Sequence, residues 1–338
     1  MLFWVAGLSL VLSFIGTAVM RRYALATEML DVPNERSSHS ATTPRGGGLA
    51  IVAAALGGAL SLAAVGGAIN RSLLLWVFAA AGVAAVGFAD DRVALSARSR
   101  LLVHAIAAVL LVAAVGIKRI PWPSGIGLVD PGMLGIVLVA VATIWSINLF
   151  NFMDGIDGIA GAQAVFVFCA AATIEYRDIG YDYSEGLLLI FATSAFGFLV
   201  WNWPPARIFM GDVGSGFLGF LVPVAALLTS GAGGVSVWTW VVLYGAFIAD
   251  ATTTLTVRAL RGDRVFDAHR THVYQRLARR WNSHGRVVLL YAAVNLLWLF
   301  PLGALTTLDP KYSAWIALLA LSPLVIAALA LRAGQPDR

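Results

Sequence analysis

This chain is organised around one polar stretch, Asn148-Leu-Phe-Asn151-Phe-Met-Asp154-Gly155-Ile-Asp157-Gly158-Ile-Ala-Gly161. Apolar runs flank it at 133–147 and 162–174, so its carboxamides and carboxylates fall where one membrane helix should end and the next begin. The four polar residues recur every three positions, and on a helix such neighbours share a face. Groups this polar are costly at a bilayer edge unless they bind something. A plain turn with helix caps is the alternative interpretation.

Composition predicts a membrane protein. Of the 338 residues 59% are hydrophobic and 12% are charged, whereas a soluble domain carries about 25% charged residues. A spanning helix needs about 20 apolar residues, and runs of this kind predict an all-α integral membrane protein with about eleven transmembrane helices, in a single domain over residues 1–338. The expected spans are roughly 2–20, 47–68, 72–89, 101–117, 132–150, 159–175, 185–201, 214–230, 236–257, 286–304 and 313–332.

Arginine and lysine gather in alternate loops, at 21–46, 90–100, 202–213 and 258–285. Because cytoplasmic loops carry an excess of basic residues, these loops are predicted to be cytoplasmic, with the N-terminus outside. The net charge of +5 is therefore assigned to membrane topology, and no nucleic-acid partner is expected. We expect the bacterial inner membrane as the location.

Two cytoplasmic loops carry candidate phosphate and cation groups. The first contains Asp31-Val-Pro33-Asn-Glu-Arg36-Ser-Ser-His39 and then Pro44-Arg45-Gly46-Gly47-Gly48. Glycines beside Arg45 allow backbone and guanidinium to approach a phosphate together, although a packing role is an equal alternative. The next loop begins at the adjacent carboxylates Asp90 and Asp91, whose repulsion a cation or a proton would relieve. A solvated helix end is the alternative for this pair.

Two later segments complete the pattern. Gly211-Asp212-Val-Gly214-Ser215 is predicted to open a helix, which places a carboxylate beside backbone N–H groups where a metal could be held. The last inner loop carries His269, Arg270 and His272, which suit hydrogen bonding to a diphosphate better than zinc binding. An ordinary positive-inside loop is the alternative there. His104 and Asp250, which lie inside spans, are interpreted as packing residues.

Together these motifs resemble the polyprenyl-phosphate N-acetylhexosamine-1-phosphate transferases of glycosyltransferase family 4, the group that includes the phospho-N-acetylmuramoyl-pentapeptide transferases. The matching motifs run in family order over about residues 30–277. Two features depart from the pentapeptide enzymes: Ala94 replaces a lysine, and His269-Arg270-Thr271-His272 replaces a histidine triplet. The latter is similar to the subgroup that starts O-antigen or capsule glycans, often with a 6-deoxy-N-acetylhexosamine.

The resemblance implies that the phosphate of undecaprenyl phosphate attacks the β-phosphate of a UDP-N-acetylhexosamine and releases UMP. It also implies Mg²⁺, with Mn²⁺ as the alternative, held by Asp212 and Asn151. Asp90 and Asp91 would orient or deprotonate the lipid phosphate, Asp154 would serve the metal or the local geometry, and Asp157 would contact uracil. Phosphate-holding roles are implied for Arg45, Arg100, His269, Arg270 and His272. The lipid bilayer is the expected surroundings, and a homodimer is left open.

Other classes of protein are weighed against this one. A membrane transporter also places ionisable groups at broken helices, but near the midplane of the membrane and not at one edge. A CDP-alcohol phosphotransferase would have Asp-Gly-x-x-Ala-Arg, whereas here Ile159-Ala160-Gly161 follows Gly158 without an arginine. A soluble all-helical prenyl synthase is excluded by the hydropathy. The transporter is the remaining alternative.

Overall fold

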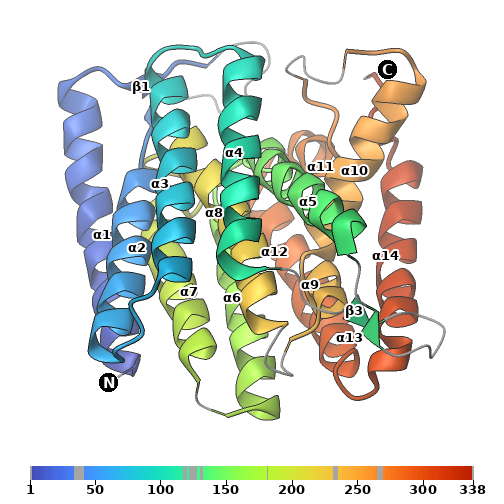
Figure 1. The fold of residues 1–338 in the computed structure, drawn as a ribbon. Coiled ribbons are helices and arrows are strands. Elements are labelled where there is room, and N and C mark those ends of the chain that lie inside the picture. The colour runs from blue at the N-terminus through green and yellow to red at the C-terminus, as the bar shows by residue number, and fades with distance from the viewer. Residues whose placement is uncertain are drawn as a thin grey trace.

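The protein is a bundle of long apolar helices (Figure 1). The computed structural model describes residues 2–33, 42–116, 120–121, 128–129, 132–180, 182–230, 235–264 and 269–336. Within these ranges ten helices are long and apolar enough to cross a membrane, or eleven if one bent pair counts as a span. The prediction of an all-α membrane protein with about eleven spans is therefore confirmed.

The spanning helices have similar lengths. Their bounds are α1 (Leu2–Ala26), α2 (Gly48–Val65), α3 (Arg71–Arg92), α4 (Ala97–Val115), α5 (Gly132–Phe152), α6 (Ile159–Asp178), α7 (Tyr183–Asn202), α8 (Asp212–Thr229), the continuous run of α12 (His284–Val294), π-helix η1 (Asn295–Leu299) and α13 (Phe300–Leu305), and α14 (Ser313–Ala330) after the 3₁₀ turn η2 (Pro310–Tyr312).

One predicted span is broken. The stretch expected to cross at 236–257 forms α9 (Val237–Leu243) and α10 (Gly245–Leu260), which meet at 75°. Leu299 packs closely against Gly245. A Cβ atom added to Gly245 would lie 3.2 Å from the Leu299 side chain. A glycine at the break permits both the bend and this contact. Hydropathy alone could not distinguish a bent pair from a straight helix.

Short elements lie at the ends of the bundle. The strands β1 (Leu30–Asp31) and β2 (Thr43–Pro44) pair antiparallel, as do β3 (Ile120–Pro121) and β4 (Leu128–Val129). The amphipathic helix α11 (Val273–Trp281) packs beside α12. Figure 1 shows β1, the α3–α4 connection and the C-terminus at one end, and the N-terminus and β3 at the other.

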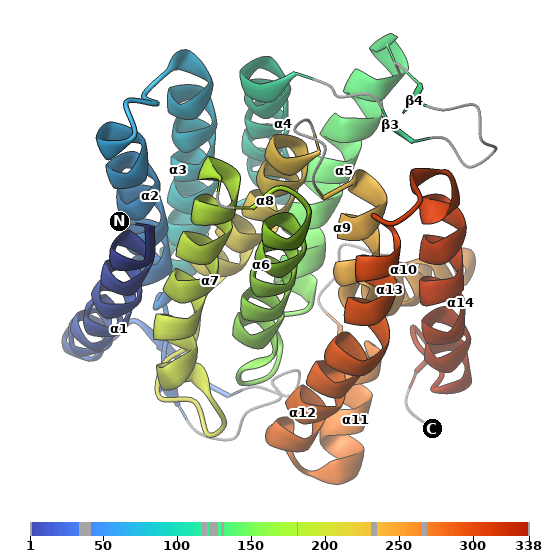
Figure 2. The same cartoon turned by 90° about the horizontal axis from the view of Figure 1, so that it is seen from below.

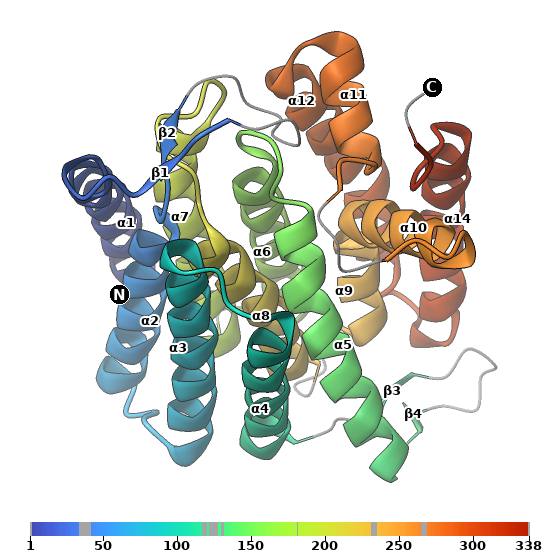
Figure 3. The ribbon, with the colours of Figure 1, turned by 90° about the horizontal axis from the view of Figure 1, so that it is seen from above.

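The middle of the bundle is the best-packed part. Of the residues in each best apolar window, 72% are buried in α6, α7 and α8, against 22% in α1, α4 and α14. Seen from below in Figure 2 and from above in Figure 3, α1 and α14 lie at opposite edges. The peripheral helices therefore present their side chains to lipid, while the central helices can hold polar groups in fixed positions.

Candidate active site

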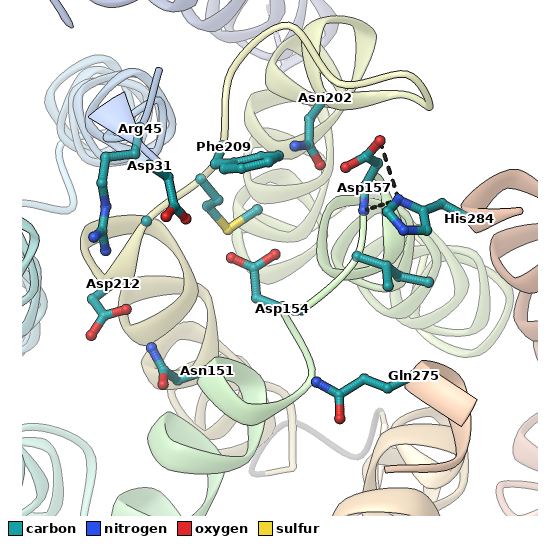
Figure 4. Close-up of a pocket in the computed structure, with 14 residues that line it drawn as sticks. Asp31, Arg45, Asn151, Asp154, Asp157, Asn202, Phe209, Asp212, Gln275 and His284 are labelled. Carbon is teal, nitrogen blue, oxygen red and sulfur yellow. Dashed lines mark hydrogen bonds and ion pairs between the residues drawn. The ribbon is translucent and has the colours of Figure 1, made fainter. Parts of the chain in front are cut away.

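A polar cavity of about 250 Å³ collects most of the polar motifs. Its wall combines the segment that precedes α2, the α5–α6 turn, the start of α8 and the α11–α12 hairpin (Figure 4). Segments from both halves of the chain thus meet at one site. The lining residues are Asp31, Arg45, Asn151, Asp154, Gly155, Ile156, Asp157, Asn202, Phe209, Met210, Gly211, Asp212, Gln275 and His284.

Close backbone contacts fix the start of α8. The helix begins at Asp212, as predicted, after Gly211 with a φ of +76°. A Cβ at Gly87 of α3 would lie 2.4 Å from the Asp212 carbonyl oxygen, and one at Gly48 of α2 would lie 2.3 Å from the Gly214 Cα. Only glycine permits such approaches. The carboxylate of Asp212 is therefore held where α2, α3 and α8 converge.

Asp91 lies beneath this junction and does not line the cavity. Its fully buried carboxylate accepts hydrogen bonds from the backbone N–H groups of Asp212 at 2.9 Å and Val213 at 3.2 Å, so it caps α8 from α3. The guanidinium of Arg45 donates to the same carboxylate. Burial alone would lower the pKa of Arg45, but the charges of Asp91, Asp212 and Asp31 outweigh burial and raise the pKa. Arg45 therefore stays cationic in the wall.

Asp90 faces away from its neighbour. Its Oδ1 accepts from the Leu95 N–H at 2.6 Å, and its Oδ2 accepts from Arg100 at 2.7 Å. Arg100 also reaches Oδ2 of Asp212 at 3.3 Å. The adjacent carboxylates thus have different partners, yet both are connected to Asp212, Asp91 through the backbone N–H and Asp90 through Arg100.

A second, smaller cavity of about 30 Å³ lies on the α3–α4–α5 side of Asp212 and Asn151. Arg100, His104 and Asn148 line it. Asn148 donates to the Ile144 carbonyl of its own helix at 2.7 Å. His104 is buried, in agreement with its interpretation as a packing residue.

Within the polar stretch 148–161, helix α5 ends at Phe152. Asn151 lies in the helix and donates to the Ser215 hydroxyl at 3.1 Å. Asp154 and Asp157 lie beyond Phe152, in a turn, so only Asn148 and Asn151 of the four polar residues share a helical face. The glycine-containing turn ends the helix and points both carboxylates into the cavity (Figure 4).

Asp154 lies near the centre of the view in Figure 4. Burial raises its pKa well above the usual carboxyl range, and the negative charges of Asp212 and Asp91 add to the effect, while Arg45 opposes it. Ionisation of this carboxylate is therefore costly in the absence of a neighbouring cation.

Asp157 is tied to two other segments. Its Oδ2 lies 3.2 Å from Nδ1 of His284 and accepts the Ala206 N–H at 3.1 Å. The next residue, Gly158, donates its N–H to the Asn202 side chain at 2.9 Å. The sequence interpretation did not include Asn202, Gln275 or His284, because nothing local in the chain associates them with the α5–α6 turn.

The His/Arg loop does not reach the cavity. His272 is 2% exposed, and its Nδ1 lies 3.3 Å from Oδ1 of Asp250. His269 stacks on His272 with ring centroids 4.9 Å apart, and burial lowers the pKa of His269 to about 3. Arg270 is exposed. Their phosphate-holding roles stay predictions, as do any roles of Arg36, His39 and Asp267, which lie outside the described residues.

The oxygen donors of the cavity fit a magnesium ion. Mg²⁺ is usually held by one or two carboxylates together with substrate phosphates and water. Asp212, Asn151 and Asp154 offer carboxylate and amide oxygens to one cavity. No cluster of three or more His, Cys, Asp or Glu able to enclose a metal occurs among the described residues, so the fit is to an open site completed by a substrate.

Fold and site together define a multi-pass membrane protein with a polar cavity in which Arg45 lies among four aspartates. The family described as "Glycosyl transferase family 4" matches residues 73–230. A decaprenyl-phosphate N-acetylglucosaminephosphotransferase of Mycolicibacterium smegmatis is 30% identical over 340 residues, covering 90% of this chain and 82% of the relative. This chain belongs to glycosyl transferase family 4, the family of these polyprenyl-phosphate sugar-1-phosphate transferases.

Two other relatives indicate the breadth of the family. A probable undecaprenyl-phosphate N-acetylglucosaminyl 1-phosphate transferase of Bacillus subtilis is 27% identical over 328 residues, covering 94% of this chain and 87% of the relative. A phospho-N-acetylmuramoyl-pentapeptide-transferase of Bacillus licheniformis is 26% identical over 309 residues, covering 86% of this chain and 92% of the relative. The resemblance stated from the motifs is therefore confirmed at the level of the family.

Proposed function

We propose that this protein transfers an N-acetylhexosamine-1-phosphate from a UDP-sugar to undecaprenyl phosphate at the cytoplasmic face of the bacterial inner membrane. An oxygen of the lipid phosphate forms a bond to the β-phosphorus, the bond between that phosphorus and the bridging oxygen breaks, and UMP leaves. One observation carries the proposal: Asp212, Asn151, Asp154 and Arg45 line a single cavity. The relatives' names supply the reaction class.

Charge neutralisation and positioning are the main demands of this reaction, because both substrates are anions. Arg45 presents a guanidinium held by Asp91, so it offers a fixed positive charge to a phosphate. Asp212, Asn151 and Asp154 would hold Mg²⁺ or Mn²⁺, whose charge would offset that of the diphosphate. The protein's own contribution is to present these groups in one place before the substrates arrive.

Asp90 and Asp91 act by positioning in this proposal. Asp91 aligns Asp212 and Arg45 from below, and Asp90 aligns Arg100. A lipid phosphate has a second pKa of about 6, so much of it is already the dianion at neutral pH. A strong base is therefore not required, and neither carboxylate needs to abstract a proton.

The product would start a cell-envelope glycan such as an O-antigen. The His-Arg-Thr-His run and Ala94 support a substrate other than the muramoyl-pentapeptide donor, and a 6-deoxy-N-acetylhexosamine is included in the proposal. A panel of UDP-N-acetyl sugars, tested with purified protein, Mg²⁺ and polyprenyl phosphate, would identify the donor by the release of UMP.

Isotope exchange tests the reaction class. One phosphoanhydride bond replaces another, so we expect the reaction to run backwards and labelled UMP to enter the UDP-sugar pool. This exchange should require both Mg²⁺ and polyprenyl phosphate. A transporter would give no covalent exchange, and a hydrolase would release UMP without the lipid. Release of UDP, or absence of exchange with every donor tried, would contradict the proposal.

Cysteine labelling tests the orientation. Cys169, which is the only cysteine, is first replaced by serine. Cysteine at Asp263 should then react with an impermeant reagent only from the cytoplasm, and cysteine at Asp309 only from outside. The reverse pattern would exclude a cytoplasmic nucleotide-sugar as the donor.

A further inference from the structure

The pairing of Asp157 with His284 joins two segments that are 127 residues apart. The side chains are only 12% and 17% exposed, and both line the cavity. Nδ1 of His284 lies 3.2 Å from Oδ2 of Asp157 and 3.4 Å from the Asp157 N–H (Figure 4). In one tautomer the Asp157 N–H donates to an unprotonated Nδ1. The carboxylate oxygen 3.2 Å away favours the protonated nitrogen instead, because an unprotonated Nδ1 would turn its lone pair toward a negative charge, and the protonated Nδ1 donates to Oδ2.

Local structure aims His284 at this carboxylate. Asn282 takes the left-handed conformation, with a φ of +46°, and reverses the chain after α11. Ser283 caps α12 by accepting the Arg286 N–H at 3.3 Å. His284 is therefore the first residue of α12 and sits at the corner of a tight helical hairpin, where its direction is set by the backbone.

The hairpin is also anchored beside the α5–α6 turn. The Tyr274 hydroxyl donates to the Phe152 carbonyl at 2.8 Å. A Cβ at Gly155 would lie 2.2 Å from that hydroxyl and 3.0 Å from Nε2 of Gln275. The turn that carries Asp157 and the hairpin that carries His284 are thus packed against each other, and the contact between the two side chains closes one side of the cavity.

This pair lies away from the groups proposed to hold the diphosphate. Figure 4 shows Asp212 and Asn151 on one side of Asp154, and Asp157 and His284 on the other. A nucleotide whose phosphates meet Asp212 would extend its base toward Asp157. The uracil ring carries one N–H donor, which a carboxylate accepts.

We propose that His284 is a positioning residue that fixes the Asp157 carboxylate for hydrogen bonding to the base of the donor nucleotide. The inference rests on the proposed function, because it takes a uridine nucleotide as the ligand. With the Nδ1–H of His284 and the Ala206 N–H both on Oδ2, the carboxylate cannot rotate without losing a hydrogen bond. Without His284 the carboxylate loses this restraint, and part of the binding energy is spent on ordering the carboxylate.

Three substitutions of His284 distinguish the loss of its hydrogen-bond donor from the loss of its side-chain volume. Asparagine places an N–H donor near the position of Nδ1, glutamine places it near that of Nε2, and alanine removes it. We expect His284→Ala and His284→Gln to raise the KM for the UDP-sugar about tenfold, the effect of losing one hydrogen bond to a charged group. The KM for polyprenyl phosphate and kcat should change less than about threefold. His284→Asn should restore the KM for the UDP-sugar.

A double-substitution test uses Asp157→Asn as the background. If His284 acts through Asp157, adding His284→Ala to Asp157→Asn should change the KM for the UDP-sugar little further. Additive effects of the two substitutions would overturn the proposal. So would equal behaviour of the alanine, asparagine and glutamine variants, or a fall in kcat with an unchanged KM.

Binding of UMP separates this inference from the proposed function. Titration calorimetry with purified protein, Mg²⁺ and UMP needs no turnover. Weaker UMP binding by His284→Ala and recovery in His284→Asn would support the pairing even if no sugar-phosphate transfer were found. Wild-type protein that does not bind UMP would overturn it. If the alanine variant fails to fold, as judged by gel filtration, the contrast between asparagine and glutamine decides.

Discussion

Two aspartates in polar surroundings, Asp250 and Asp154, behave in opposite ways. Asp250 in α10 accepts the N–H groups of Val273 at 2.9 Å and Tyr274 at 3.0 Å, and the hydroxyl of Tyr291 at 2.6 Å. His272 lies against the same carboxylate. Asp154, by contrast, faces a cavity whose nearest charged groups include two further carboxylates. The protein supplies hydrogen-bond donors to the Asp250 carboxylate, whereas the Asp154 carboxylate faces a cavity among like charges.

The different surroundings of Asp250 and Asp154 distinguish a polar residue with a structural role from a candidate functional residue. A buried carboxylate with several donors fastens helices together, as Asp250 does for α10, α11 and α12. A carboxylate that lies among other carboxylates destabilises the protein alone and becomes favourable when a cation binds. The second arrangement, and not acidity as such, marks the candidate site.

The largest expected effect is that of replacing Asp212, which lines the cavity together with Asp154. Asp212→Asn keeps the size of the side chain but removes a charge that a hard cation needs. We expect UMP release to fall about a thousandfold or more while the melting temperature changes little. Asp263→Asn, at a half-exposed position outside the cavity, is the control. Near-normal turnover of the Asp212 variant with Mg²⁺ would remove this residue from the site.

Asp250→Ala should act on stability instead. Buried donors left without an acceptor cost about 1–3 kcal/mol each, so the melting temperature in detergent should fall by about 5–10 °C. The protein that remains folded should keep most of its turnover per molecule. A large loss of kcat with no change in melting temperature would place Asp250 with the functional group.

Asp91→Asn tests a carboxylate that does not line the cavity but holds two residues that do, Asp212 and Arg45. Asparagine retains one oxygen for the α8 N–H groups but loses the charge that holds Arg45. We expect kcat to fall about tenfold to a hundredfold, less than for Asp212→Asn. If activity returned fully at higher pH, proton transfer and not positioning would be its role.

The smallest expected effect is a pH-dependent change in stability. Because the pKa of Asp154 is raised in the folded protein, the native state binds more protons than the unfolded chain, and stability falls as pH rises above the ordinary carboxyl range. Asp154→Asn should thus raise the melting temperature of metal-free protein by a few degrees at pH 8 and by less toward pH 4. An equal shift at both pH values would show that the charge is not the cause.

The sequence by itself determined the architecture and the chemical inventory. Apolar runs of about 20 residues decide where helices cross, because the bilayer leaves no other way to satisfy the backbone. The motif around Asp154 and the Gly211-Asp212 start of α8 contain half of the residues that line the cavity. The prediction of the spanning helices was confirmed because hydropathy acts locally along the chain.

Only the tertiary structure decided which of the polar groups share the cavity. Adjacent Asp90 and Asp91 have different hydrogen-bond partners, whereas Asp157 and His284, which are far apart in the chain, touch. His272 belongs to the Asp250 network because the bend between α9 and α10 carries Asp250 to the start of α11. Helix packing and bends set these contacts, and they depend on distances across the fold that no local pattern records.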